Sequence, residues 1–305
     1  IRAVGEYVIL TDSSADLTAE LVAELGVEVI PLSFTMEDKT YFNYPDNRDI
    51  DPADFYARLR GGAMATTAAV NVADYTEAIE PILKEGKDVL VLAFSSGLSA
   101  TCHSAQIAAG ELMEQYPDRK VYVVDTLCAS LGQGLLVWYA ANLKKQGKSM
   151  EEVRDWTEEH KLNLCHWFTV DDLHFLKRGG RISSATAVLG TMLSIKPVMH
   201  VDNEGHLIKV GTARGRNASL KALVDHMEQT VLDLKGQSIF ISHGDCLADA
   251  QKVADDIRAR FGVEDIVINY VGPVIGAHSG PGTVALFFMG LSLIHISEPT
   301  RHAQI

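Results

Sequence analysis

Short apolar runs alternate with helix-like segments along the first half of the chain. The run Val89–Phe94, VLVLAF, has the length and continuous apolar character of a strand that is covered on both faces. Because strands that alternate with helices of ordinary length are joined by βαβ crossovers, we expect a mostly parallel sheet flanked by helices. The other strands predicted here are Tyr7–Leu10, Val27–Leu32 and Val121–Asp125, and the helices are Thr18–Leu25, Pro52–Arg60, Ala100–Gln115 and Gly132–Gln146.

The second half has a different pattern. Two strand-like segments, Ser194–Asp202 and His206–Ala213, flank the turn Asn203–Gly205, which is typical of an antiparallel hairpin. The other elements predicted here are the helices Glu151–Leu162, Ser219–Leu234 and Ala248–Phe261, and the strands Ser238–His243 and Ile266–Tyr270. We therefore predict an α/β protein of two domains. The N-terminal domain, residues 1–160, has the parallel sheet, and the C-terminal α+β domain, residues 161–290, has antiparallel strands.

Composition narrows the class of protein. The 305 residues are 47% hydrophobic and 22% charged, which is typical of a globular chain. A formal charge of −13 argues against nucleic-acid binding, and no uninterrupted apolar window of about 18 residues predicts a membrane span. The four cysteines are widely spaced and form no CxxC pair, so we expect a reduced cytoplasmic protein with no metal site. Residues 291–305, LSLIHISEPTRHAQI, are expected to be a non-native tail.

The turn Ser95–Thr101 joins the strand Val89–Phe94 to the helix that follows. It places serine hydroxyls and free backbone N–H groups at a helix N-terminus, where a carboxylate or phosphate is stabilised. The alternative is that Ser95 or Ser96 only caps the helix. A second polar turn, Asp12–Asp16, also follows a strand, and ligands lie beyond the carboxyl ends of parallel strands. We expect the two turns to face one pocket.

Two later loops are also candidates. Gly272–Gly282 is rich in glycine and is predicted to be a loop whose backbone forms an anion-binding nest around His278. The alternative is a histidine with a structural role. In the second loop, Arg214 and Arg216 flank Gly215 before a helix. Arginine suits carboxylate and phosphate recognition, and the alternative is a solvated pair.

Taken together, these segments resemble the DegV family of fatty-acid-binding proteins over about Tyr7 to Gly290. The resemblance rests on the order and spacing of six short segments, none of them specific alone. They are ILTDSSADLT at Ile9–Thr18, SSGLSAT at Ser95–Thr101, DT at Asp125–Thr126, LKRGGRIS at Leu176–Ser183, KPVMHVDNEGHLIKVGTARGR at Lys196–Arg216 and GPVIGAHSGPG at Gly272–Gly282.

The resemblance implies a carrier that holds one long-chain fatty acid such as palmitate as ligand between its two domains, with the tail buried. It implies no other cofactor and no catalysis by the carrier itself. It also implies a fatty-acid kinase as partner, which would convert the bound acid to an acyl phosphate. Ser95 and Ser96 match the family's hydroxyls at the carboxylate, and Arg214 and His278 match its basic pair. Thr66 and Thr67 lie where the family has a Thr-Ser-Gln-Pro-Ser-like loop, although the Gln, Pro and later Ser are absent here.

Two enzyme hypotheses stand beside the carrier. A serine esterase or thioesterase would use Ser95 or Ser96 as nucleophile, with His103, His243 or His278 as base and Asp12 or Asp125 as the orienting group. No G-x-S-x-G surrounds either serine. The second enzyme hypothesis is a small-molecule phosphotransferase, but no G-x-x-x-x-G-K-[ST] loop is present. Spacing along the chain does not decide whether any of these groups meet.

Overall fold

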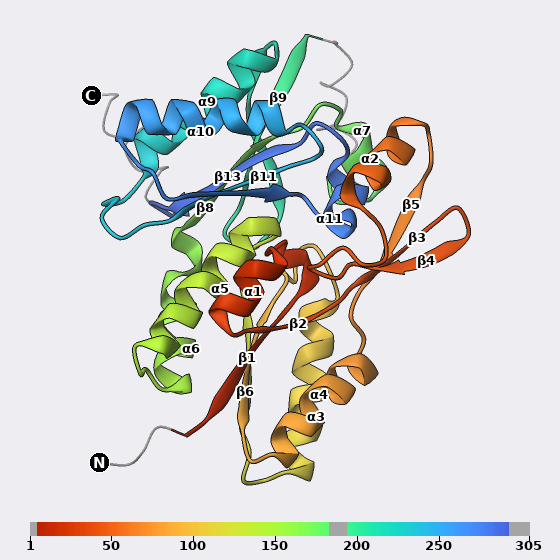
Figure 1. Cartoon of the computed structure of the whole chain (residues 1–305), viewed down its shortest axis with the longest axis vertical. Helices are drawn as coiled ribbons and strands as arrows, with labels where there is room; N and C mark the ends of the chain where they lie inside the picture. The colour runs from red at the N-terminus through yellow and green to blue at the C-terminus, as the bar shows by residue number, and fades with distance from the viewer. Residues whose placement is uncertain (1–4, 183–193, 293–305) are drawn as a thin grey trace.

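The computed structural model describes residues 5–182 and 194–292. It contains three sheets and the helices that cover them (Figure 1). Nearly all of the predicted tail at 291–305 and the end of the segment Leu176–Ser183 lie outside the described residues.

The first sheet is parallel, as predicted. In spatial order its strands are β2 (Glu28–Ile30), β1 (Tyr7–Asp12), β6 (Asp88–Ala93) and β7 (Val121–Asp125). Successive β6 side chains alternate between two apolar clusters, with Leu90 and Leu92 on one face and Val89 and Val91 on the other. The prediction that this strand is covered on both faces is therefore confirmed.

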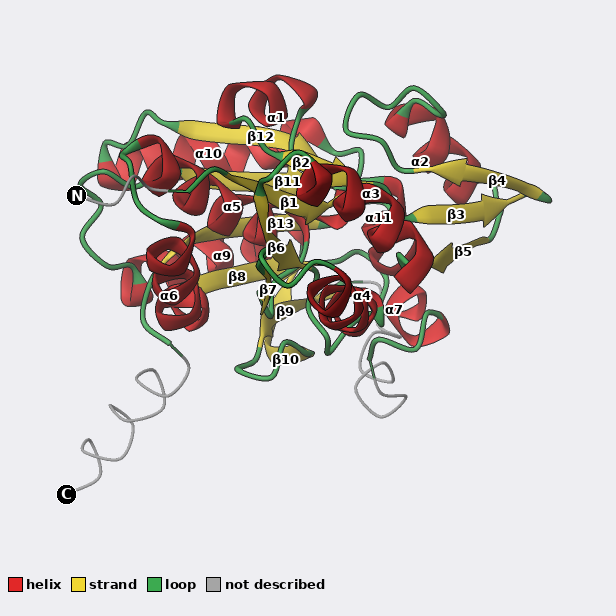
Figure 2. Cartoon of the chain, turned by 90° about the horizontal axis from the view of Figure 1, so that it is seen from below, coloured by secondary structure: helices red, strands yellow, loops and turns green. Residues whose placement is uncertain are grey.

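The second sheet is a small antiparallel one that the sequence analysis did not predict. Figure 2 shows it extending sideways from the rest of the molecule, beside α2. Its strands are β4 (Lys39–Phe42), β3 (Ser33–Met36) and β5 (Ala65–Ala68). β5 lies at one edge, so its side chains alternate between the two sides of this sheet.

The third sheet is mostly antiparallel and includes the predicted hairpin. Only its pair β11–β12 is parallel among the strands described. In spatial order the strands are β10 (Leu207–Arg214), β9 (Ile195–Val201), β8 (Leu164–Thr169), β13 (Val284–Met289), β11 (Ile239–His243) and β12 (Ile266–Tyr270). All described strands up to Asp125 belong to the first two sheets and all from Leu164 to the third. The domain limits themselves stay a prediction.

The helices cover these sheets on several sides (Figure 1). α5 lies between the first and third sheets and packs against β6 on one side and β8, β11 and β13 on the other. The α-helices are α1 (Ala19–Leu25), α2 (Pro52–Arg60), α3 (Val72–Lys84), α4 (Thr101–Gln115), α5 (Ser130–Lys145), α6 (Met150–His160), α7 (His174–Arg178), α9 (Arg216–Thr230), α10 (Leu247–Phe261) and α11 (Pro273–Ser279), with 3-10 turns η1 (Ser13–Ala15) and η2 (Lys161–Asn163).

The prediction of a loop over Gly272–Gly282 is wrong in its middle. Residues Pro273–Ser279 form the helix α11, which begins at a proline in its first turn and ends before Gly280. Gly280 and Gly282 have positive φ angles of 83° and 84°. The backbone of this segment therefore bonds within a helix instead of forming an open anion-binding nest, and His278 lies in the last turn of α11.

Candidate functional site

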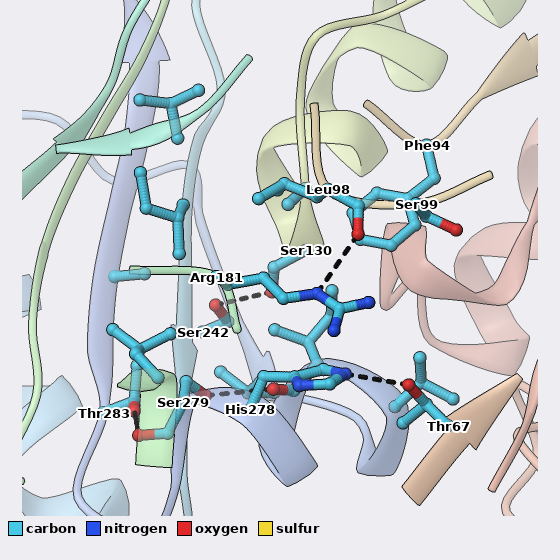
Figure 3. A pocket seen from close by; sticks show the side chains of 18 of the residues that line it. Thr67, Phe94, Leu98, Ser99, Ser130, Arg181, Ser242, His278, Ser279 and Thr283 are labelled. Carbon is cyan, nitrogen blue, oxygen red and sulfur yellow. Dashed lines mark hydrogen bonds between the residues drawn. The ribbon is translucent and has the colours of Figure 1, made fainter. Parts of the chain in front are cut away.

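A cavity of about 250 Å³ lies between the first and third sheets. One wall comes from the carboxyl end of the parallel sheet and the start of α5, and the floor comes from the third sheet. α11 and β5 close the side shown in Figure 3. The side chains lining it are mainly apolar: Leu32, Phe94, Leu98, Phe168, Leu176, Val201, Leu207, Val271, Val274, Ile275, Ala285 and Phe287, with four further alanines.

The floor of the cavity is a row of facing residues on the third sheet. Ala285 of β13 pairs with Phe168 of β8 on one side and with Ser242 of β11 on the other. All three are buried, and all three line the cavity. His166 and Phe287 extend the same face and contact each other edge to face. This floor is a fully buried and largely apolar surface.

Thr67 and His278 meet at a less buried part of the lining (Figure 3). The Thr67 hydroxyl lies 2.8 Å from Nε2 of His278. Burial and the nearby Arg181 charge lower the pKa of His278 to about 4, so the imidazole is neutral at physiological pH. Its Nδ1 is buried and has no hydrogen-bond partner within the described part of the chain. A Cβ added to Gly179 would lie 2.3 Å from that nitrogen, so a glycine is needed there.

Arg181 is the one charged side chain among the described residues that line the cavity. Its Nε donates to the Leu98 carbonyl at 3.3 Å, and Nη1 donates to the Gly179 carbonyl. Burial lowers its pKa, but an arginine remains charged at any physiological pH. The guanidinium has five N–H donors, and the described residues use two of them. Arg181 was not predicted as a site residue, although it lies in the LKRGGRIS segment.

The turn at Ser95 and Ser96 packs against the β9–β10 hairpin. The Ser95 hydroxyl donates to the Gly205 carbonyl at 2.9 Å and accepts from the Gly97 N–H at 3.2 Å. Ser96 is exposed, and its backbone N–H donates to Asp125 Oδ1. Neither serine is among the residues lining the cavity, whereas Ser99 of the same turn is.

Thr66 and Arg214 also lie outside the cavity lining. Thr66 precedes Thr67 in β5 and points to the opposite, exposed side of its sheet. Arg214 is exposed at the end of β10, opposite Ile195. The structure thus brings together Thr67 and His278 of the six predicted site residues, and adds Arg181 to them.

The Asp12–Asp16 turn reaches the cavity through a buried chain of hydrogen bonds. The Ser130 hydroxyl donates to Asp16 Oδ2 at 2.7 Å and lies 3.0 Å from the Ser242 hydroxyl. Ser130 and Ser242 line the cavity. Burial raises the pKa of Asp16 to about 7, against hydrogen bonds from Ser130 and the Gly272 backbone. Ser130 has a positive φ of 53° at the first position of α5, a conformation that sequence pattern does not reveal.

The esterase hypothesis requires a serine bonded to a histidine. In the described residues, the Ser95 hydroxyl contacts only the backbone of Gly205 and Gly97, and the Ser96 hydroxyl has no hydrogen bond. The Asp12 carboxylate bonds within the first sheet and its loops, where its Oδ2 accepts from the Phe94 N–H at 2.9 Å. Asp125 likewise accepts only backbone N–H groups, those of Ser96 and Leu127.

Metal ligands and membrane-spanning helices bear on other classes of function. Over 5–182 and 194–292, no three His, Cys, Asp or Glu side chains gather as a metal site requires. No described helix has both the length and the apolar character needed to cross a bilayer.

Comparison with known proteins gives consistent relatives. A family model described as "Uncharacterised protein, DegV family" matches residues 6–290. A DegV domain-containing protein of Clostridium perfringens is 47% identical over 285 residues, which are 93% of this chain and 98% of that protein. Among solved structures, a DegV family protein from Thermus thermophilus, described by its fatty acid binding, is 33% identical with a TM-score of 0.80, covering 94% of this chain and 100% of that chain. DegV of Bacillus subtilis, described as a fatty acid binding protein, is 27% identical with a TM-score of 0.81 and the same coverage. The predicted α/β fold class is thereby confirmed.

Proposed function

This chain belongs to the DegV family, and from that premise we propose that it binds one long-chain fatty acid, such as palmitate. The observation that carries the proposal is the lining of the cavity. Its floor is buried and apolar, whereas Arg181, His278 and Thr67 are only partly buried. An acyl chain fits the floor, and a carboxylate fits beside the guanidinium. The description of the T. thermophilus and B. subtilis relatives as fatty-acid-binding supports this proposal.

The energetics of burial suit such a ligand. Each methylene removed from water contributes about 0.8 kcal/mol before the costs of association are subtracted. An acyl chain therefore binds without any catalytic chemistry, and the polar end serves mainly to orient it. Within the described residues Arg181 uses two of its five N–H donors, and the neutral His278 and Thr67 add uncharged partners. A carboxylate has about four lone-pair sites on its two oxygens, so one held in this way still has an unused lone pair.

That unused lone pair supports the second part of the proposal, transfer to a kinase. A carboxylate oxygen of the bound acid would attack the terminal phosphorus of ATP on a partner fatty-acid kinase, and ADP would leave. The carrier itself would supply no catalytic residue.

The four cysteines are free thiols, three of them buried, which supports a proposed location in the cytoplasm, where the kinase and ATP are available.

The roles of Thr66, Ser95, Ser96 and Arg214 in holding the head group stay predictions. The Ser95 hydroxyl is engaged with Gly205, so it reaches a carboxylate only if the hairpin turn moves. Arg214 is exposed, which suits a contact with the kinase or its nucleotide better than one with the buried acid.

Native mass spectrometry of the purified protein tests the fatty-acid proposal. We expect a stoichiometric adduct with the mass of a long-chain fatty acid, identified after denaturation by lipid analysis. Ala285→Phe would fill the floor of the cavity and is expected to lose the adduct while keeping a native circular dichroism spectrum. A wild-type protein that stays ligand-free after incubation with palmitate would overturn the proposal.

The kinase proposal is tested separately, by acyl-phosphate formation with a fatty-acid kinase and ATP. Arg214→Ala is expected to keep its bound fatty acid and to lose at least about tenfold in acyl-phosphate formation, since a charge-assisted contact is worth about 1.5–3 kcal/mol. Thr212→Ala is the matched control, because Thr212 is exposed on the same face of β10. Equal activity of both variants would contradict a role for Arg214.

A further inference from the structure

A groove lies between α3 and α4, which pack against each other beside the first sheet (Figure 1). None of the described residues that line it lines the fatty-acid cavity. Its α3 residues span about 14 Å along the helix axis. The groove is lined by Glu111 of α4 and by two rows of α3 residues spaced one turn apart, Val72, Thr76 and Glu80, and Ala73, Glu77 and Pro81.

The apolar part of the groove faces solvent. Val72 is half-buried, and Ala73 and Pro81 are exposed. Ile107 lies one turn before Glu111 on the same side of α4 and is 39% exposed, so it adds apolar surface beside the groove. Both helices therefore offer apolar side chains that a second protein could cover.

Acceptor groups surround this apolar surface. Glu77 and Glu111 are exposed and form no ion pair within the described residues, whereas Glu80 pairs with Lys84 at 3.2 Å. Pro81 lies inside α3 and has no N–H, so the Glu77 carbonyl lacks the donor that the residue four positions later normally provides. The groove thus presents negative charge and acceptor oxygens, which lysine and arginine side chains complement.

Both helices begin at the Arg181 end of the cavity. Ala69 and Ala100 line the cavity, and α3 and α4 begin within three residues after them. The two connections are joined by a 3.3 Å hydrogen bond from the Val70 N–H to the Thr101 hydroxyl. Arg181 itself donates to a carbonyl of the loop before α4. A protein seated in the groove would therefore lie next to the polar end of the cavity.

From this arrangement we propose that the groove between α3 and α4 is the docking surface for the kinase partner, which would insert a helix with an apolar stripe flanked by lysine or arginine. The inference rests on the proposed function and adds the surface by which the two proteins meet. Apolar side chains of the inserted helix cover Ala73 and Pro81, and its cations pair with Glu77 and Glu111. The formal charge of −13 attracts a basic partner at long range, and the groove determines where it docks.

The first test measures acyl-phosphate formation by a fatty-acid kinase while the concentration of loaded carrier is varied. The double variant Glu77→Lys, Glu111→Lys is expected to raise KM for the carrier at least about tenfold with little change in kcat, because like charges then face the partner's cations. Glu24→Lys, Glu159→Lys is the matched control. These two glutamates are exposed on α1 and α6, outside the groove, and the change in net charge is the same. Native mass spectrometry checks that both variants keep the fatty acid.

The second test uses the wild type, so it does not depend on how a variant folds. Carbodiimide and glycine ethyl ester label exposed carboxylates, and mass spectrometry of the digested protein gives the extent at each position. With the kinase bound, Glu77 and Glu111 are expected to lose most of their labelling, and Glu24 and Glu159 to keep it.

The outcomes separate this inference from the proposed function. A wild type that binds no fatty acid overturns fatty-acid binding and this inference with it, and one that binds the acid without being phosphorylated overturns the kinase proposal and the docking surface together. If phosphorylation proceeds but labelling of Glu77 and Glu111 is unchanged, or the control pair raises KM as much as the groove pair, only the docking surface is overturned. Labelling that falls with carrier concentration alone would assign the groove to a second copy of this chain and overturn it as well.

Discussion

At the scale of single residues, the position of His278 depends on a glycine outside the cavity lining. The glycine Gly179 follows α7, with φ −75° and ψ −7°, and an alanine there would place its Cβ 2.3 Å from His278 Nδ1. The imidazole would have to move, and its 2.8 Å contact with Thr67 would be lost. We expect Gly179→Ala to weaken fatty-acid binding by up to about tenfold, measured by titration calorimetry, since a hydrogen bond typically contributes about 0.5–1.5 kcal/mol.

Gly61 is a matched control for that prediction. It also follows a helix, with φ −75° and ψ −1°, but a Cβ there would meet its nearest atom at 3.4 Å. Gly61→Ala should therefore leave the fatty-acid affinity unchanged. An equal loss in both variants would mean that helix ends, and not the position of His278, determine binding.

Ser95 makes a second prediction at this scale. Its hydroxyl bonds the Gly205 carbonyl in a fully buried contact between two turns. Ser95→Ala leaves that carbonyl without its donor, so we expect the free energy of unfolding in urea to fall by about 1 kcal/mol. Fatty-acid affinity measured on the same variant then decides whether the hydroxyl also contacts the carboxylate. Unchanged stability would contradict the importance of the hairpin contact.

At the scale of elements, α5 is the helix that packs against both the first and the third sheet. Gly132 lies in its first turn, and a Cβ there would lie 2.2 Å from His166 Nε2, which is fixed by a hydrogen bond from the Ala129 N–H at 3.3 Å. Gly132→Ala should lower the free energy of unfolding by about 1–3 kcal/mol through overpacking. Gly110→Ala in α4 meets nothing within 4 Å and should raise it, by up to about 1 kcal/mol. Urea unfolding of the two variants measures both, and the same sign in both would contradict this account.

Sequence pattern predicts a helix or strand well where apolar residues continue along its whole length. It predicts an element poorly where only a few of its residues are buried. β7 and β12 have the predicted bounds, because their apolar runs end at polar residues. The strands β3, β4 and β5 were missed, since each has only four residues with exposed positions. α3 was missed although Asn71 and Asp74 form a capping box, which is a readable signal in the sequence.

The candidate site is less predictable because its parts come from distant segments. Thr67 and His278 lie 211 residues apart in the chain and Asp16 and Ser130 lie 114 apart, so only the packing of the sheets joins them. The family resemblance pointed to Thr67 and His278. It did not point to Ser130 or Ser242, whose places in the cavity lining follow from a positive φ and from a register across the third sheet.

At the scale of the whole molecule, buried neutral histidines predict loss of stability in acid. Burial lowers the pKa of His166 to about 3 and that of His200 and His278 to about 4. Below the ordinary histidine pKa of 6.5, these imidazoles bind protons in the unfolded chain but stay neutral in the folded protein. Acid therefore favours unfolding from about pH 6.5 down to about pH 4. Each such proton contributes about 1.4 kcal/mol per pH unit.

Asp16 changes the stability with pH in the opposite direction to the histidines, so two variants test the prediction. Its pKa of about 7 when folded, against 3.8 otherwise, means that the folded state holds a proton that the unfolded chain has lost between those values. Asp16 alone would therefore make stability fall as the pH rises through that range. Burial lowers the pKa of five described histidines, His166, His200, His226, His243 and His278, and raises that of two carboxyls, Asp12 and Asp16. The histidines outnumber the carboxyls, so we expect the unfolding free energy of lipid-free protein in urea to decrease on acidification from pH 6.5 to 4. His200→Asn should flatten this dependence by about one proton, and Asp16→Asn should steepen it by about one. A flat profile in the wild type, or the same change of slope in both variants, would show that these buried groups do not control the stability of the fold.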